Sequence, residues 1–103
     1  MTHGQLKRRV FDWLYEQGCF VWNNNTGSWK PEGQPRIYYG KKGSADVLGL
    51  TRHGRHIEVE VKVKPDKQNE DQVKHQQEVE SRNGIYVLVY SLDDLEARKG
   101  EIA

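Results

Sequence analysis

Two carboxylates and one lysine are spaced so that they can share a small surface. Glu60 and Lys62 lie two apart in the alternating run 57–63, and residues two apart in a strand point to the same face. Asp46 belongs to the preceding segment, residues 45–50, which is predicted to be the neighbouring strand. A Mg²⁺ or Mn²⁺ ion held by such oxygens activates water for attack on a phosphate. The pattern therefore indicates metal-dependent chemistry on a phosphate ester.

A three-residue turn sets the register of these two strands. Residues 52–54, Arg-His-Gly, end in a glycine, which suits the left-handed position that such a turn often needs. With this turn Thr51 pairs with Arg55, and counting outward places Asp46 directly opposite Glu60. Directly opposed residues share a face, with Cβ atoms about 5 Å apart. We therefore expect the two carboxylates to meet, whereas a two-residue turn would put Asp46 on the other face.

The same alternation also has a simpler interpretation. Glutamate and lysine that alternate along a strand are typical of a solvated face with cross-strand ion pairs. Glu58 shares the face of Glu60, and we expect it to pair with Lys64 rather than to bind a second cation. The other face of the run is apolar. Asp46, in matched register, strengthens the case for a metal site but does not by itself decide against the solvated face, so both interpretations stay open at this point.

Length and composition predict a single domain over residues 1–103. The chain is 35% hydrophobic and 30% charged, with many aromatic and β-branched residues, which suits a small globular domain. Cys19 is the only cysteine, so there is no internal disulfide, and its apolar surroundings place it in the core. No apolar run is long enough to cross a membrane. Residues 1–43 carry a net charge of +4 and the remainder −3, so the amino-terminal part suits a polyanionic partner.

Capping patterns and hydrophobic periodicity predict the order helix, three strands, helix, strand, helix. The expected elements are a helix from the Thr2 cap to Gly18, strands at 19–22, 45–50 and 57–63, a helix from the Asn69 cap to about Asn83, a strand at 85–90, and a last helix from Ser91. The segment 23–43 between the first two strands is polar and rich in Gly and Pro. We expect it to be a long loop, and long loops in compact domains are often functional.

Several short pieces of the chain, in this order and at this spacing, resemble a known family. They are residues 22–27, 39–49, 54–55, 58–62, 71–72 and 84–89. The family is the VRR-type nuclease (VRR-NUC) domain of the PD-(D/E)xK nuclease superfamily, in the small stand-alone form found in phages and bacteria. The resemblance implies an α/β (α+β) fold with a restriction-endonuclease-like core, in the order αβββαβ(α). Its mixed central sheet would be flanked by helices.

The resemblance also implies roles for individual residues. Asp46 and Glu60 would be metal ligands, the carbonyl of Val61 a third ligand, and Lys62 the residue that orients the attacking water. Gln72, at the start of the second helix, matches a glutamine typical of the family's active site. Four residues fall in segments that would approach DNA: Asn25, Lys41, Lys42 and Ser44.

The implied function is that of a Mg²⁺- or Mn²⁺-dependent endonuclease that hydrolyses phosphodiester bonds in DNA. The expected substrate is flapped or branched DNA, such as a four-way junction. The expected state is a homodimer, with two active sites on two strands. The expected location is the cytoplasm of a bacterium or of a phage-infected host cell.

One departure from the family pattern concerns the first helix. The family commonly has a glutamate there that faces the metal site, and the candidate positions in this chain hold His3 or Gln5. The alternative function is therefore a nuclease-fold DNA-binding module that is catalytically weak or inactive. A sugar- or nucleotide-binding domain is a third class, but the chain has no glycine-rich phosphate loop of the Walker or dinucleotide type.

Aromatic and basic residues outside this pattern allow two interpretations each. We expect Trp13 and Trp22 to pack in the protein, and leave open whether Trp29 packs or stacks on unpaired bases. The basic run 7–9 on the first helix either contacts phosphate or forms a solvated helix face. The spacing of the histidines suits no metal site of their own. His53 and His56 flank the turn and are expected to face solvent, and His75 to lie on the packed side of the second helix.

Overall fold

The computed structural model describes all residues, 1–103, as four helices, a four-stranded sheet and a separate two-stranded hairpin. The elements are α1 (His3–Glu16), β1 (Phe20–Asn23), β2 (Gly27–Trp29), β3 (Ile37–Tyr39), β4 (Val47–Leu50), β5 (His56–Val61), α2 (Glu70–Ser81), β6 (Ile85–Val89), α3 (Leu92–Glu96) and α4 (Lys99–Ile102). None of the helices combines the length and apolarity needed to cross a bilayer.

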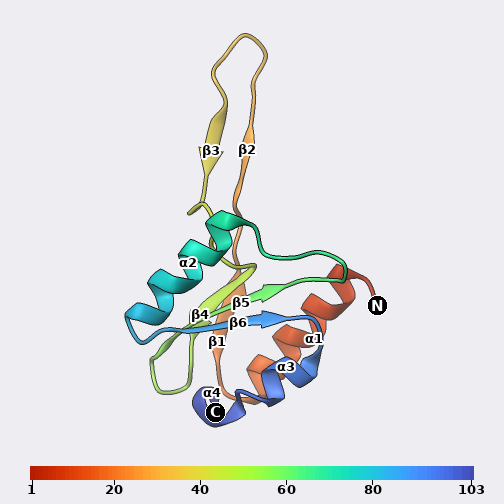
Figure 1. The fold of residues 1–103 in the computed structure, drawn as a ribbon, viewed down its shortest axis with the longest axis vertical. Helices are drawn as coiled ribbons and strands as arrows, with labels where there is room; N and C mark the ends of the chain where they lie inside the picture. The colour runs from red at the N-terminus through yellow and green to blue at the C-terminus, as the bar shows by residue number, and fades with distance from the viewer.

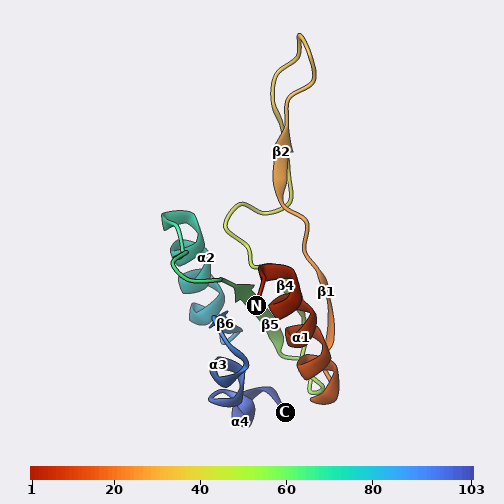
Figure 2. The ribbon, with the colours of Figure 1, turned by 90° about the vertical axis from the view of Figure 1, so that its right-hand side faces the viewer.

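The central sheet is mixed and has helices on both sides. Its strand order is β1-β4-β5-β6, with β1–β4 and β4–β5 antiparallel and β5–β6 parallel. The parallel pair needs a crossover connection, and α2 supplies it. Figure 2 shows α1 and α2 on opposite sides of the sheet. The fold therefore has the expected helix–sheet–helix layers.

The hydrophobic core lies between α1 and one face of the sheet. Leu6, Val10, Trp13 and Leu14 of α1 are buried at helical spacing, against the alternate residues of the strands that face them. Cys19 is buried in the same cluster, as expected, and burial raises the pKa of its thiol. α2 contributes no buried residue. The second face of the sheet, beneath α2, therefore holds the polar residues of β5.

The turn between β4 and β5 has the predicted register. Val47 pairs with Val59, the Thr51 amide donates to the Arg55 carbonyl at 2.8 Å, and the last turn residue, Gly54, has a φ of +86°. β4 itself begins at Val47, two residues later than predicted. Asp46 thus precedes the regular strand, although its carbonyl accepts a hydrogen bond from the Asn24 amide at 2.8 Å.

The segment that was expected to be a long loop contains an extended hairpin. We call residues 24–43 the arm: β2 and β3 pair antiparallel in it, with Ser28 opposite Tyr38. The arm projects well away from the body of the molecule (Figure 1), and the whole chain, arm included, measures 50 Å along its longest axis. The prediction of an unstructured loop was wrong here because each strand has only three residues and one includes a glycine, which leaves too little alternation to detect.

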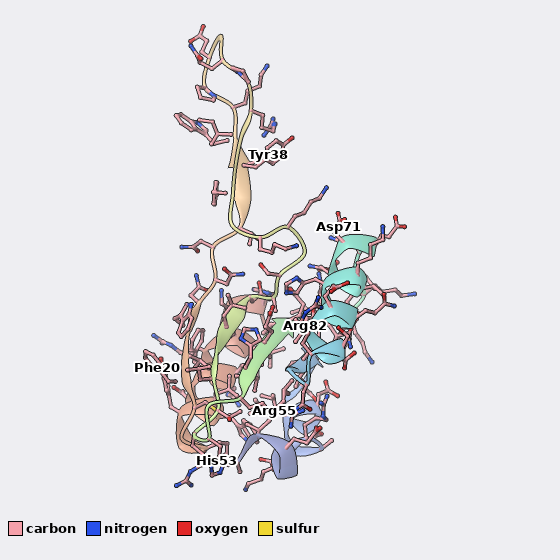
Figure 3. All side chains as sticks on the ribbon, turned by 90° about the vertical axis from the view of Figure 1, so that its left-hand side faces the viewer. Phe20, Tyr38, His53, Arg55, Asp71 and Arg82 are labelled. Carbon is pink, nitrogen blue, oxygen red and sulfur yellow. The ribbon has the colours of Figure 1, made fainter.

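The outer strand β1 leaves an apolar surface uncovered. Phe20, Trp22 and Leu50 are 68%, 46% and 39% exposed, and we call these three residues the β1 patch. Phe20 and Leu50 are directly paired, so they share a face, and Phe20 points outward into solvent (Figure 3). Trp22 packs edge-on against Phe20, with ring centroids 5.4 Å apart, but it stays at the surface and does not enter the core. α2 packs against β6, at the opposite edge of the sheet, and so does not cover this end.

Candidate active site

The Asp46 carboxylate lies at the carboxyl end of β5, where it is held by the backbone. Its Oδ2 accepts a hydrogen bond from the amide of Val61 at 2.9 Å. This contact follows from the register of the turn, because Asp46 comes opposite Glu60, the neighbour of Val61. One carboxylate oxygen is thereby oriented, and the amide that orients it belongs to the residue whose carbonyl is the expected third metal ligand.

Glu60 is almost completely buried next to Asp46. Its side chain faces the layer beneath α2, the residue is only 4% exposed, and its Oε2 has no hydrogen-bond partner. Burial, a hydrogen bond with Asp46 and the charge of Asp46 raise the pKa of Glu60 to about 8, while the nearby cations Lys62 and Lys7 act in the other direction. Two carboxylates this close repel each other when both are ionised, and a bound cation would relieve that repulsion.

His3, on the first turn of α1, is the third side chain at this position. Its Nε2 donates to the Val61 carbonyl at 3.0 Å and lies 3.5 Å from Asp46 Oδ2. Gln5, the other candidate for the family's helix-one glutamate, is used elsewhere: its Oε1 accepts from the Thr2 amide at 2.9 Å in the capping box of α1. The structure therefore places His3 at the site, and Gln5 at the helix cap.

Two lysines approach the carboxylates from different elements. Lys62 directly follows β5, and its amide continues the sheet by donating to the Val89 carbonyl at 2.9 Å. Lys7 lies one turn after His3 on α1, and both lysines lower the pKa of Glu60. In the sequence Lys7 stands out only as part of the basic run 7–9, which does not reveal this placement. Lys7 lies four residues after His3, so both residues share one face of the helix. This spacing is the sequence pattern that could have placed Lys7 near the site.

Gln72 is held by the cap of α2. Its Oε1 accepts from the Asn69 amide at 2.9 Å, and its own amide donates to Asn69 Oδ1 at 2.9 Å. This is the capping box that the sequence predicts. A role for Gln72 in the active site stays a prediction.

The residues expected to approach DNA lie around the base of the arm in different environments. Ser44 is buried, and its hydroxyl donates to the Lys41 carbonyl and accepts from Asn24 Nδ2, both at 2.6 Å. Asn25 is exposed and accepts from Asn23 at 2.9 Å. Lys41 is exposed, and Lys42 lies 3.4 Å from Asp71 at the start of α2. Ser44 thus shapes the turn, while Asn25 and the lysines are accessible.

Glu58 does not pair with Lys64, so that expectation was wrong. Its two oxygens lie 2.8 Å from the Nε2 atoms of His75 and His56, and the Ala45 amide donates to it at 3.2 Å. α2 brings His75 onto the strand, and the two imidazoles occupy both oxygens of Glu58. Because β5 ends at Val61, Lys64 lies beyond the strand whose alternation would have placed it on the same face. His75 lies on the packed side of α2 as predicted. His56 is partly exposed as predicted, but its ring turns toward Glu58.

The donors gathered at the end of β5 suit a divalent cation. No three His, Cys, Asp or Glu side chains converge on one point in the manner of a finished metal cluster. The nearby donors are two carboxylates, the Val61 carbonyl and the His3 imidazole, an oxygen-rich set in which water would complete the coordination of Mg²⁺ or Mn²⁺. The unpartnered, buried Glu60 Oε2 is the observation that supports this fit.

Comparison with known proteins identifies the class of fold. No protein-family model matches the chain, and no curated protein does. A solved structure described as a "VRR_NUC domain" superposes with a TM-score of 0.65, covering 92% of this chain and 90% of that chain at 19% sequence identity. The chain is therefore a nuclease-fold domain of the α+β class. More narrowly, it has the VRR-NUC fold, which confirms the fold that the sequence resemblance implied.

Proposed function

We propose that this protein is a metal-dependent endonuclease that hydrolyses phosphodiester bonds in DNA. The observation that carries the proposal is the partly exposed Asp46 carboxylate next to the buried Glu60, beside Val61, with the Glu60 Oε2 atom unpartnered. A buried carboxylate oxygen without a partner is costly for stability, and a bound cation would offset that cost. The resemblance to the VRR-NUC family adds support, since it implies that Asp46 and Glu60 are metal ligands.

The residues at the site have two proposed roles: some bind the metal ion, and others orient the attacking water. Asp46, Glu60, the Val61 carbonyl and His3 would hold Mg²⁺ or Mn²⁺. The bound ion would supply an acidified water and neutralise charge on the phosphate. Lys62 is near enough to Glu60 to affect its charge, and we assign it the orientation of the attacking water and the stabilisation of the transition-state charge. Lys7 would add a second positive charge from α1. The products would carry a 5′-phosphate and a 3′-hydroxyl.

The proposed substrate is flapped or branched DNA, and the proposed assembly is a homodimer. Asn25, Lys41 and Lys42 stand exposed near the base of the arm, where they can contact a phosphate backbone. The β1 patch is an apolar surface of the kind that a second copy covers. A dimer built on it would present two sites to two strands.

A second candidate function is a DNA-binding module that has lost hydrolysis. One observation favours it: His3 donates a hydrogen bond to the Val61 carbonyl, the atom expected to bind metal. A side chain that occupies this carbonyl competes with a cation for it.

The deciding experiment is cleavage of end-labelled single-stranded, duplex, flapped and four-way-junction DNA in Mg²⁺, Mn²⁺ or EDTA. Wild type should cut in metal and not in EDTA, and Lys62→Ala should lose the activity. Lys64→Ala is the matched control, because Lys64 is an exposed lysine two residues farther along. Binding without cutting in every metal would establish the DNA-binding module instead. Full activity of Lys62→Ala would contradict the mechanism.

A further inference from the structure

The arm exposes apolar side chains that its own structure cannot bury. Trp29, Ile37, Tyr38 and Tyr39 are 61%, 48%, 75% and 50% exposed. A two-stranded hairpin has no second layer and is marginally stable alone. Three aromatic residues on such an element are therefore available to a partner.

The two faces of the arm differ in chemistry. Strand pairing puts Trp29 beside Ile37 on one face and Ser28 beside Tyr38 on the other. Arg36 belongs to the Tyr38 face, since its Nη1 donates to the Ser28 hydroxyl at 3.0 Å. One face is thus apolar, while the other combines a tyrosine ring with a guanidinium and a hydroxyl.

A hollow at the base of the arm lies beside the Ser28–Tyr38 pair. It has a volume of about 320 Å³ and is lined by Tyr38, Tyr39, Lys42 and the neighbouring glycine-rich backbone. Gly27 leaves room for the Tyr39 ring, because a Cβ there would come within 2.7 Å of the Tyr39 hydroxyl. The Tyr39 ring lies on the Trp29 face, and the Tyr38 ring on the opposite face. An exposed tyrosine ring with a lysine beside the hollow suits a planar base that carries a phosphate.

The base of the arm is tied to the candidate active site. Asn24 donates its amide to the Asp46 carbonyl at 2.8 Å, and its Nδ2 to the Ala45 carbonyl at 2.8 Å. On the other side, Lys42 lies 3.4 Å from Asp71 at the start of α2, the end of α2 that lies nearest the arm in Figure 3. A ligand held in the hollow would therefore lie on the path to Asp46.

We propose that the arm binds an unpaired DNA strand along its Tyr38 face: a base stacks on Tyr38, and phosphates contact Arg36 and Lys42. The strand is thereby led to the site at the end of β5. This inference rests on the proposed nuclease function and names the part of the substrate that the enzyme recognises. Every base has a π-face, so stacking needs no particular sequence, but it does need bases that are not already stacked in a duplex. The arm therefore selects an unpaired strand.

Charge favours a nucleic acid over a second copy of the chain. The arm carries Lys30, Arg36, Lys41 and Lys42 against a single acid, Glu32. Two arms packed together would bring like charges into contact, whereas a phosphate backbone neutralises them.

The test is the affinity for fluorescein-labelled single-stranded, duplex and flapped DNA, measured by anisotropy in EDTA so that nothing is cut. Tyr38→Ala should weaken single-strand and flap binding at least about fivefold and leave duplex binding unchanged. Tyr38→Phe should bind as wild type, because it keeps the ring. Tyr15→Ala, which removes an exposed aromatic ring of α1 outside both the arm and the β1 patch, should also bind as wild type. A shortened arm, with Asn-Gly in place of residues 29–37, connects the opposed residues Ser28 and Tyr38 through a two-residue turn and should lose the contribution of Arg36.

Several outcomes would overturn the inference. They are unchanged strand binding by Tyr38→Ala and the shortened arm, equal losses on single strand and duplex, or no strand binding by wild type. Arm variants that turn a dimer into a monomer by light scattering, without loss of strand affinity, would assign the arm to a second copy. A wild type that binds single strands through the arm but cuts nothing would refute only the proposed hydrolysis.

Discussion

At the scale of single residues, Glu60 explains most about the site. Burial and the neighbouring Asp46 disfavour the ionised form of the Glu60 carboxyl. The protein can reduce this unfavourable energy in two ways. It can keep a proton on the pair or bind a cation there. The choice between the two depends on pH and on metal.

Glu60 makes the stability of the metal-free protein depend on pH. In the folded state its pKa is raised to about 8, by burial first and by Asp46 second, from an ordinary value of 4.5. The folded state therefore binds more protons than the unfolded state within this window, and the free energy of unfolding should fall as the pH rises from about 5 to about 8. Thermal unfolding in EDTA measures it. Glu60→Gln, which cannot titrate, should show a flatter dependence, and parallel curves would contradict the assignment.

His3 should determine which metal the site prefers. Imidazole suits softer transition metals, whereas Mg²⁺ prefers oxygen ligands. We expect wild type to bind Mn²⁺ better than Mg²⁺ by calorimetry, and His3→Glu to shift the preference toward Mg²⁺ by about tenfold. Gln5→Glu is the control, since Gln5 serves the helix cap, and it should leave the preference unchanged. A metal preference that His3→Glu does not alter would remove His3 from the site.

At the scale of elements, α2 contributes through polar contacts with the sheet. It buries no residue of its own, yet it covers β5 and supplies His75 to the buried Glu58. The attachment of this helix therefore depends on hydrogen bonds more than on apolar area.

Removing the His75 ring should loosen this attachment. His75→Ala leaves Glu58 Oε1 with the Ala45 amide, at 3.2 Å, as its remaining partner, and the loss of one buried hydrogen bond costs about 0.5–1.5 kcal/mol. Urea unfolding should show this loss, while His53→Ala, on the exposed turn, should be neutral. Equal stability of the two variants would mean that water replaces the ring.

At the scale of the whole molecule, the uncovered end of the sheet bears on assembly. The β1 patch is apolar and lies at the β1 edge of the sheet, with Leu50 contributed by the neighbouring strand β4, so a second copy can bury it. We expect a dimer in light scattering at micromolar concentration, and a monomer for Trp22→Glu because a buried carboxylate opposes the contact. Trp29→Glu, the same change on the arm, should leave the dimer intact. A wild-type monomer would refute the assembly.

Local features of the chain were readable from sequence. The Arg-His-Gly turn determined the register of β4 and β5, and with it the meeting of Asp46 and Glu60, because turn length alone sets which residues face each other. The capping boxes at Thr2 and Asn69 were likewise visible, since each involves residues three apart. The fold followed from the order of such elements together with the family resemblance.

Other features depended on contacts between distant segments, and only the tertiary structure decided them. His3 contacts the Val61 carbonyl, 58 residues away in the sequence. The sequence alone did not decide whether His3 or Gln5 takes the position of the family's helix-one glutamate. The burial of Glu58 and Glu60 required α2 to cover a face that reads as solvated. The arm was invisible because its short strands lack a core and so leave no hydrophobic period. Sequence patterns show which side of an element is apolar. Which other element packs against that side depends on the free energy of the whole folded chain, and so on contacts between residues far apart in the sequence.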